Sequence, residues 1–197
     1  MKKILSVFVL LAFVVAMYGQ REVTKFLGIP VDGYKRDMIH KLKEKGFTYD
    51  STHDCLNGEF NGRKVNVFVA TNNNKVWRIM LADADVMDEA SIKIRFNTLY
   101  QQFCDNKKYE SSYFNQRLSD NEDISYEMTV NKKRYEAVFY QLNLKADAYT
   151  GTRETADDGA FDYLKRNVWF MINQYYGEYY ISMFYDNEYN KANGEDL

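Results

Sequence analysis

The sequence predicts an α+β domain in which two helices pack on one face of a curved antiparallel sheet. Two segments carry apolar residues three or four positions apart, which is the spacing of one face of a helix. Several shorter runs alternate apolar and polar residues, as strands do when one face of a sheet is buried. Aromatic residues make up 16% of the chain, and their rings favour strands.

The first helix is predicted over residues 33–45. Asp32 stands at its start, where a short acidic side chain accepts hydrogen bonds from free backbone N–H groups. Met38 and Leu42 lie four positions apart, so they share one face of the helix. Gly46 ends the helix because glycine readily adopts the left-handed conformation found at helix C-termini.

Three strands follow, over residues 56–60, 64–70 and 76–81. Asn61-Gly62, between the first two, is the pair that type I′ hairpin turns prefer. Asn72-Asn73-Asn74 separates the second strand from the third, and asparagine is frequent in turns. We therefore expect an antiparallel meander.

A second helix is predicted from Asp88 to the neighbourhood of Asn106, and Asp88 is again a favourable first residue. Its apolar stripe consists of Ile92, Phe96, Leu99 and Phe103. The rest of the chain predicts a polar loop, four more strands and one long excursion. The loop covers residues 109–122, the strands cover 126–130, 135–139, 168–172 and 179–185, and the excursion covers 143–166.

The two halves of the predicted domain repeat one order of elements, a helix followed by strands. Residues 26–83 form the first half and residues 88–186 the second. We interpret them as a diverged α-β-β-β repeat within a single domain over residues 20–197. The interpretation depends on the pattern of elements, because the halves share almost no identical residues.

The first nineteen residues are typical of a secretory signal peptide. Lys2 and Lys3 precede an apolar run from Ile4 to Met17, and small residues follow. The run is shorter than the ~20 apolar residues that cross a bilayer, and no second run follows. We therefore expect cleavage of residues 1–19, no membrane span in the mature chain, and a periplasmic or secreted protein.

The charge balance argues against one class of partner. The chain has 26 basic and 28 acidic side chains, and loss of Lys2 and Lys3 leaves 24 against 28, a net charge of −4. Nucleic-acid binding depends on clustered Lys and Arg side chains that meet phosphates. We therefore expect no nucleic-acid partner.

Two cysteines, Cys55 and Cys104, leave a disulfide open, and an exported compartment permits one. Cys55 alternates out of phase with the apolar Leu56, and Cys104 lies off the stripe of the second helix. If both helices cover the face to which Leu56 points, Cys55 points away from Cys104. Because a disulfide needs close and well-oriented Cβ atoms, the pattern favours two free thiols.

The sequence contains no arrangement typical of a catalytic or metal site. The only imidazoles are His40 and His53, and no serine lies in a G-x-S-x-G elbow. Phosphate-binding glycine motifs are missing as well. Residues 186–190 imitate the opening of a calcium loop, but Lys191 occupies the position that needs glycine. We predict a protein that is not an enzyme and holds no metal or cofactor.

The last predicted hairpin is dense in aromatic residues. Such rings either bury their bodies in a sheet and keep their hydroxyl groups in water, or form a binding surface. The leading hypothesis is a protein-interaction or envelope-associated module. The alternative is a glycan or small-ligand binder that stacks sugars on aromatic rings. The candidate contact residues are Trp169, Tyr176, Tyr179, Tyr180 and Tyr185.

Two segments carry a resemblance to known proteins. The stretch Phe26-Leu27-Gly28-Ile29-Pro30-Val31-Asp32-Gly33 and the ending from Val168 to Leu197 resemble small exported proteins of unknown function from Gram-negative gut anaerobes. That resemblance spans nearly the whole mature chain and implies an exported domain without assigned catalytic residues. Residues 26–82, with a Gly-Ile-Pro turn before a helix and strands, are also similar to BamE-like envelope modules, which implies an envelope-associated role.

Overall fold

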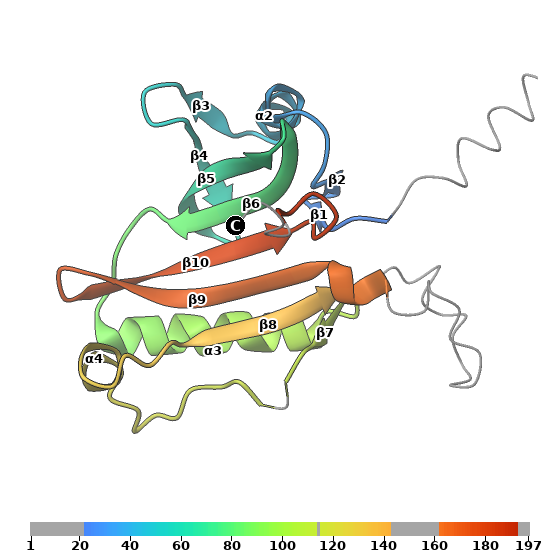
Figure 1. The fold of residues 1–197 in the computed structure, drawn as a ribbon. Helices are drawn as coiled ribbons and strands as arrows, with labels where there is room; N and C mark the ends of the chain where they lie inside the picture. Colours follow the sequence, from blue (N-terminus) through green and yellow to red (C-terminus); the bar gives the residue numbers. More distant parts are fainter. Residues whose placement is uncertain (1–21, 114, 143–161, 193–197) are drawn as a thin grey trace, which may run out of the picture.

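One large antiparallel sheet organises the chain, so the α+β class that the sequence predicts is confirmed (Figure 1). The structure, a computed structural model, describes residues 22–113, 115–142 and 162–192. The predicted signal peptide and most of the predicted excursion lie outside these residues. Within them, the sheet has eight strands in the order β3-β4-β5-β6-β10-β9-β8-β7, and every neighbouring pair is antiparallel.

The elements fall into two halves along the chain. The first half contains β1 (Lys25–Phe26), β2 (Ile29–Pro30), α2 (Lys35–Glu44), β3 (Thr48–Asp50), β4 (Cys55–Phe60), β5 (Arg63–Asn72) and β6 (Lys75–Asp83). The second half contains α3 (Glu89–Asp105), β7 (Tyr109–Ser111), α4 (Ile124–Thr129), β8 (Glu136–Gln141), the 3₁₀ turn η2 (Asp162–Lys165), β9 (Asn167–Tyr175) and β10 (Glu178–Asp186).

The sheet joins two consecutive runs of strands, β3 to β6 and β7 to β10. The last strands of the two runs, β6 and β10, pair with each other in the middle of the sheet, where Leu81 lies opposite Met183. Each run has four strands, so the prediction of three strands in the first half was too low. The missed strand, β3, is only three residues long, which is too short to show alternation in sequence.

The predicted strand over 126–130 was wrong, because these residues belong to helix α4 and the turn after it. Asp123 caps the helix by accepting a hydrogen bond from the backbone N–H of Tyr126 at 2.8 Å. The packed residues Ile124 and Met128 are four positions apart, which is helical spacing. The fourth strand of the second half is instead β7, which lies inside the segment predicted as a polar loop and pairs with β8.

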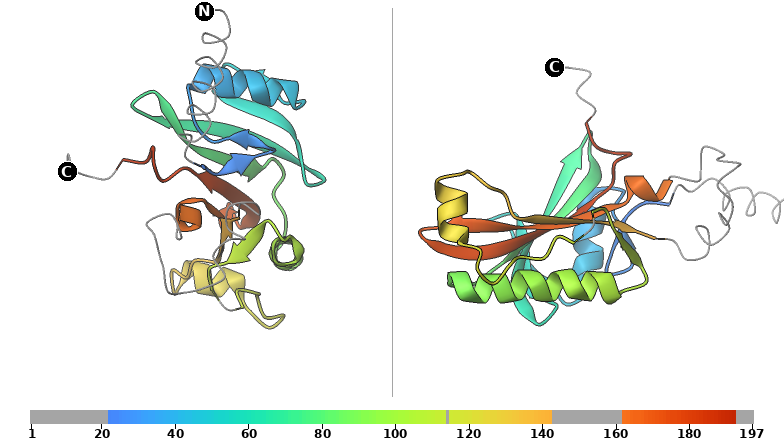
Figure 2. Two further views of the ribbon diagram at one scale, coloured as in Figure 1. Left: turned by 90° about the vertical axis from the view of Figure 1, so that its right-hand side faces the viewer. Right: turned by 90° about the horizontal axis from the view of Figure 1, so that it is seen from below.

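The inner face of the sheet, defined here by the side chains that share a face with Leu81, is the core. Helix α3 runs along one face of the sheet (Figure 2), and its predicted stripe is buried. The Phe96 and Phe170 rings meet edge-to-face at 5.0 Å, and those of Phe103 and Phe139 stack at 4.7 Å. Helix α2 packs against β3, β5 and β6 and buries Met38 and Leu42.

The N-terminal segment ties the two halves together beside the end of β10. The amide of Gln141 pairs with the backbone of Lys25, accepting from its N–H at 2.7 Å and donating to its carbonyl at 3.0 Å. The Thr24 hydroxyl donates to the backbone carbonyl of Asp186, and the Asn187 side chain donates to the Val31 carbonyl at 2.7 Å. These bonds fix the position of Asp186.

Candidate binding site

A row of apolar side chains crosses the outer face of the sheet, the face opposite the core. The strand register places one member on each of five neighbouring strands, because directly paired residues share a face. At a strand spacing of ~4.8 Å, the row is about 19 Å long. We call it the apolar row: Phe68, Met80, Phe184, Trp169 and Val138.

The apolar row is incompletely covered within the described residues. Phe184 is 8% exposed, and the other four members are of intermediate exposure. An antiparallel sheet with a single covered face normally presents polar residues on its other face. Here the outer positions of the central strands mix polar side chains, such as Asn66, Ser182 and Asn173, with the continuous apolar row, so the outer face has the character of a contact surface.

Trp169 and Phe184 form the centre of the outer face. They lie directly opposite each other on β9 and β10, and their rings stack with centroids 4.0 Å apart and planes 16° apart. The indole N–H of Trp169 donates to Asp186 Oδ2 at 3.0 Å. One side of the indole and its only polar atom are therefore already engaged, which leaves its carbon surface for other contacts.

Arg78, on β6, is held among these rings by a carboxylate. Its Nε and Nη2 atoms donate to the two oxygens of Asp186, each at 2.6 Å, in the bidentate geometry that guanidinium groups favour. The guanidinium carbon lies 4.9 Å from the ring centre of Phe184 and 5.4 Å from that of Trp169. The Asp186 side chain is only 3% exposed, so Arg78 neutralises a nearly buried charge.

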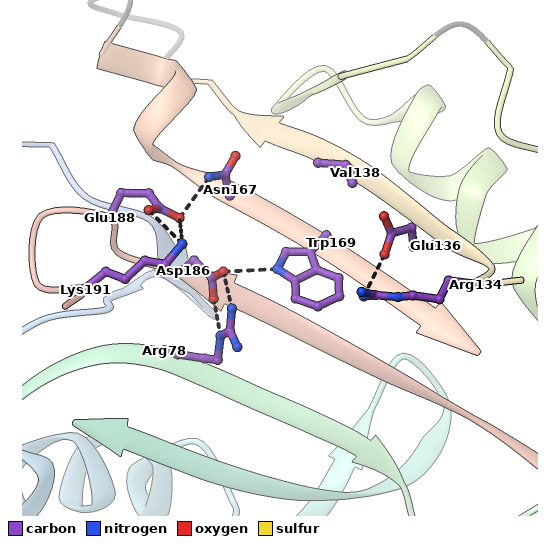
Figure 3. A pocket seen from close by; sticks show the side chains of 9 residues that line it. All are labelled: Arg78, Arg134, Glu136, Val138, Asn167, Trp169, Asp186, Glu188 and Lys191. Carbon is purple, nitrogen blue, oxygen red and sulfur yellow. Dashed lines mark hydrogen bonds and ion pairs between the residues drawn. The ribbon is translucent and has the colours of Figure 1, made fainter. Parts of the chain in front are cut away.

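An open hollow of about 310 Å³ lies next to Trp169 (Figure 3). On one side, Arg134 pairs with Glu136 at 2.9 Å. On the other, Glu188 accepts from the Asn167 amide at 3.1 Å and pairs with Lys191 at 3.2 Å. The charged residues that line the hollow are three cations, Arg78, Arg134 and Lys191, and three anions, Glu136, Asp186 and Glu188.

The five predicted contact residues differ in their exposure: three lie at the surface at least in part, and two are buried. Trp169 lies on the outer face at the hollow, and Tyr180 is half-buried on the same face of β10. Tyr176 is 91% exposed in the turn between β9 and β10. Tyr179 and Tyr185 are 2% and 3% exposed, so assigning them to a contact surface was wrong. They alternate with the outer residues and therefore point into the core.

The environment of Tyr185 shows its structural role. Its ring lies 5.0 Å from that of Phe26, between the two halves of the sheet. Burial raises the pKa of its hydroxyl well above the ordinary value, and a hydrogen bond with Tyr109 adds to the shift.

Sequence reasoning missed several residues of this surface. The apolar Phe68, Ala70, Met80 and Ala82 sit where a one-faced sheet would place polar residues, and that signal was readable in the sequence. The pairing of Arg78 with Asp186 was not readable, because the two residues are 108 positions apart. In the sequence, the run from Asp186 to Asn190 indicates only an imitation of a calcium loop.

The cysteines and histidines, the other candidates for reactive groups, lie apart from the hollow. Both cysteines are free thiols, Cys55 buried in β4 and Cys104 exposed on α3, so the disulfide that the sequence left open is not formed. Burial raises the pKa of the Cys55 thiol. His40 and His53 are exposed and lie 3.6 Å and 2.7 Å from the carboxylates of Glu44 and Asp50, away from the hollow.

In the part of the chain that the structure describes, no group of three or more His, Cys, Asp or Glu side chains could hold a metal ion. None of the helices in those same residues is long and apolar enough to traverse a bilayer.

The comparisons with known proteins add no relative. No family model, no curated protein and no solved structure matches this chain. The resemblances to small exported proteins and to BamE-like modules therefore stay predictions.

Proposed function

We propose that this chain is an exported, non-catalytic binding domain that recognises its partner with the outer face of its sheet. The observation that carries the proposal is the apolar row, which the described residues cover incompletely, with Arg78 held among its rings. Aromatic residues, Met and Arg are the residue types enriched in protein interfaces. In this proposal both α2 and α3 cover the inner face, and the two halves are diverged repeats that leave one shared surface free.

A protein partner is the first candidate because of the extent of the apolar row. A row of about 19 Å is longer than one small-molecule contact, and it carries a Trp and an adjacent Arg, which are typical of interface hot spots. The hairpin turn offers a further contact, since the rings of Tyr175 and Tyr176 meet at 4.6 Å and are 60% and 91% exposed.

A glycan is the second candidate, and the hollow beside Trp169 favours it. The hollow combines one aromatic ring with a rim of charged and amide side chains, whereas a protein contact of the same size is usually more apolar at its centre. The two candidates use overlapping parts of one surface, because Trp169 and Val138 belong to both the apolar row and the lining of the hollow.

The side chains that line the hollow support binding and not catalysis. Asp186 is tied to Arg78, and Glu188 to Asn167 and Lys191. No hydroxyl, thiol or imidazole is among the described residues that line the hollow. The carboxylates that could act as nucleophiles or as acid–base groups are held in ion pairs with Arg78, Arg134 and Lys191.

Site-specific photo-crosslinking of the full chain in its own envelope tests the proposal. A benzoylphenylalanine in place of Val138, in the apolar row, should give one discrete adduct. The same group in place of Ile94, which is 69% exposed on α3, is the matched control and should give none. Trp169→Ala should weaken the adduct at 138. Equal adducts at both positions, or an adduct only at 94, would contradict the proposal.

A further inference from the structure

We propose that the hollow beside Trp169 binds one neutral sugar ring, with the C–H face of the sugar on the free side of the indole. This inference deepens the proposed function and depends on it, because it names the ligand class for one part of the outer face. Three properties of the hollow lead to it: the platform, the charge and the rim.

The platform is a fixed carbon surface. The Phe184 ring holds the indole on one side, and Asp186 holds its N–H, so the Trp169 ring is oriented before any ligand arrives. The remaining surface of the indole has the negative face of an aromatic quadrupole. The C–H groups on one side of a pyranose ring carry slight positive charge, and they complement that face.

The charge of the hollow excludes strongly ionic ligands. Its three cations and three anions sum to zero, and each has a partner of opposite charge within 3.2 Å. An anion would meet Glu136, Asp186 and Glu188, and a cation would meet Arg78, Arg134 and Lys191. A neutral ligand meets neither repulsion, so charge complementarity favours a polyhydroxyl compound over an ionic one.

The rim supplies groups that hydroxyls can pair with. The Arg134 and Glu136 side chains are 63% and 42% exposed, so their remaining donors and acceptors face water. On the other side, Glu188 and Lys191 are 25% and 46% exposed. A hydroxyl both donates and accepts, so a sugar can bond to both members of such an ion pair. The volume of about 310 Å³ lies at the small end of ligand pockets, as expected for one ring.

Tryptophan fluorescence gives a direct test. The chain has two tryptophans, so Trp77→Phe in the full chain leaves Trp169 as the only indole reporter. The neutral probes are the methyl glycosides of glucose, galactose and mannose, together with N-acetylglucosamine. Glucuronate and glucosamine are anionic and cationic probes of the same ring size, and adenosine is a flat aromatic probe.

We expect at least one neutral saccharide to shift the Trp169 emission saturably, and the charged analogues to bind about tenfold more weakly. Binding is followed by calorimetry in variants that lack the reporter. Trp169→Ala should abolish it and Trp169→Phe should retain part of it. Ile94→Ala, which shortens a side chain that is 69% exposed on α3 and outside the hollow, should leave it unchanged. Thermal melts verify that each variant is folded, and Trp169→Phe keeps the test valid if Trp169→Ala unfolds.

Several results would overturn the inference: no response to any neutral saccharide, equal binding of the charged analogues, tighter binding of adenosine, or saccharide binding that survives Trp169→Ala. Photo-crosslinking separates this failure from that of the proposed function. A discrete protein adduct at position 138 without saccharide binding would reject the sugar and retain the outer face as a protein-binding surface. Absence of both would reject both proposals.

Discussion

Strands β9 and β10 place neighbouring residues on opposite faces of the sheet, and the two faces are covered differently. On the inner face, Phe170 is fully buried against Phe96, Phe103 and Phe139. On the outer face, Trp169 stacks on Phe184, the Arg78 guanidinium lies 4.9 Å from the Phe184 ring centre, and the apolar row is incompletely covered by the described residues. The comparison shows that apolar character alone does not separate a core from a contact surface. What separates them is whether another element of the chain covers the side chains.

Truncation of an inner-face ring should have the largest effect. Phe170→Ala removes a ring that touches three others and leaves a cavity, so the free energy of unfolding should fall by about 3–5 kcal/mol. Urea denaturation measures the change. Phe184→Ala is the matched outer-face control and should cost less, about 2 kcal/mol, because its cavity opens to solvent. Equal losses of the free energy of unfolding in the two variants would contradict the difference in cover between the two faces.

Loss of the charge at Asp186 should have the next largest effect. Asp186→Asn leaves the Arg78 guanidinium without its counter-charge among three rings, and we expect a loss of about 2–3 kcal/mol. The double variant Arg78→Met with Asp186→Leu should recover part of the stability, since apolar pairs can replace buried ion pairs. Asp85→Asn, at an exposed carboxylate, is the control. A double variant less stable than Asp186→Asn would contradict this account.

The contribution of Glu122, at the polar border of the inner face, to the stability of the fold should depend on pH. Glu122 accepts hydrogen bonds from Lys133 and from the Tyr135 hydroxyl, and these bonds lower the pKa of the Glu122 carboxyl below its ordinary value of 4.5. Its contribution is therefore complete above that value and is lost as the pH falls through the lowered pKa. Below about pH 4.5, the melting temperature of the wild type should fall more steeply than that of Glu122→Gln. Lys133→Met should flatten the profile in the same way; parallel profiles would reject the role of Glu122.

The smallest effect is expected at the tip of the hairpin and should have the opposite sign. Tyr176 has φ of +49°, the left-handed conformation that Asn61 adopts at +52° in an Asn-Gly turn. Tyr176→Asn should therefore raise the free energy of unfolding by about 0.5–1 kcal/mol. Tyr175→Asn, at a neighbouring exposed ring without positive φ, should give no gain. A gain in the free energy of unfolding at position 176 alone would show that Tyr176 does not serve the stability of the fold. That result would favour a role for Tyr176 in contact with a partner.

The elements that could be predicted are those with strong local signals. The stripe of α3, its cap at Asp88 and the turn at Asn61-Gly62 identified a helix and a hairpin without knowledge of their neighbours. Short segments gave weak signals, so residues 126–130 were predicted as a strand although Ile124–Thr129 form helix α4, and β3 was missed. In such segments the packing of a few side chains outweighs the intrinsic preference of the residues.

The sequence by itself determined the α+β class, the alternation of each strand and hence which residues could share a face, because these depend on spacing along the chain. Only the tertiary structure decided which face the helix α3 covers, that β6 pairs with β10, and that Arg78 meets Asp186 across 108 positions. Such contacts are chosen by the packing of the whole sheet. The same packing buried Tyr179 and Tyr185 and left Trp169 at an open hollow.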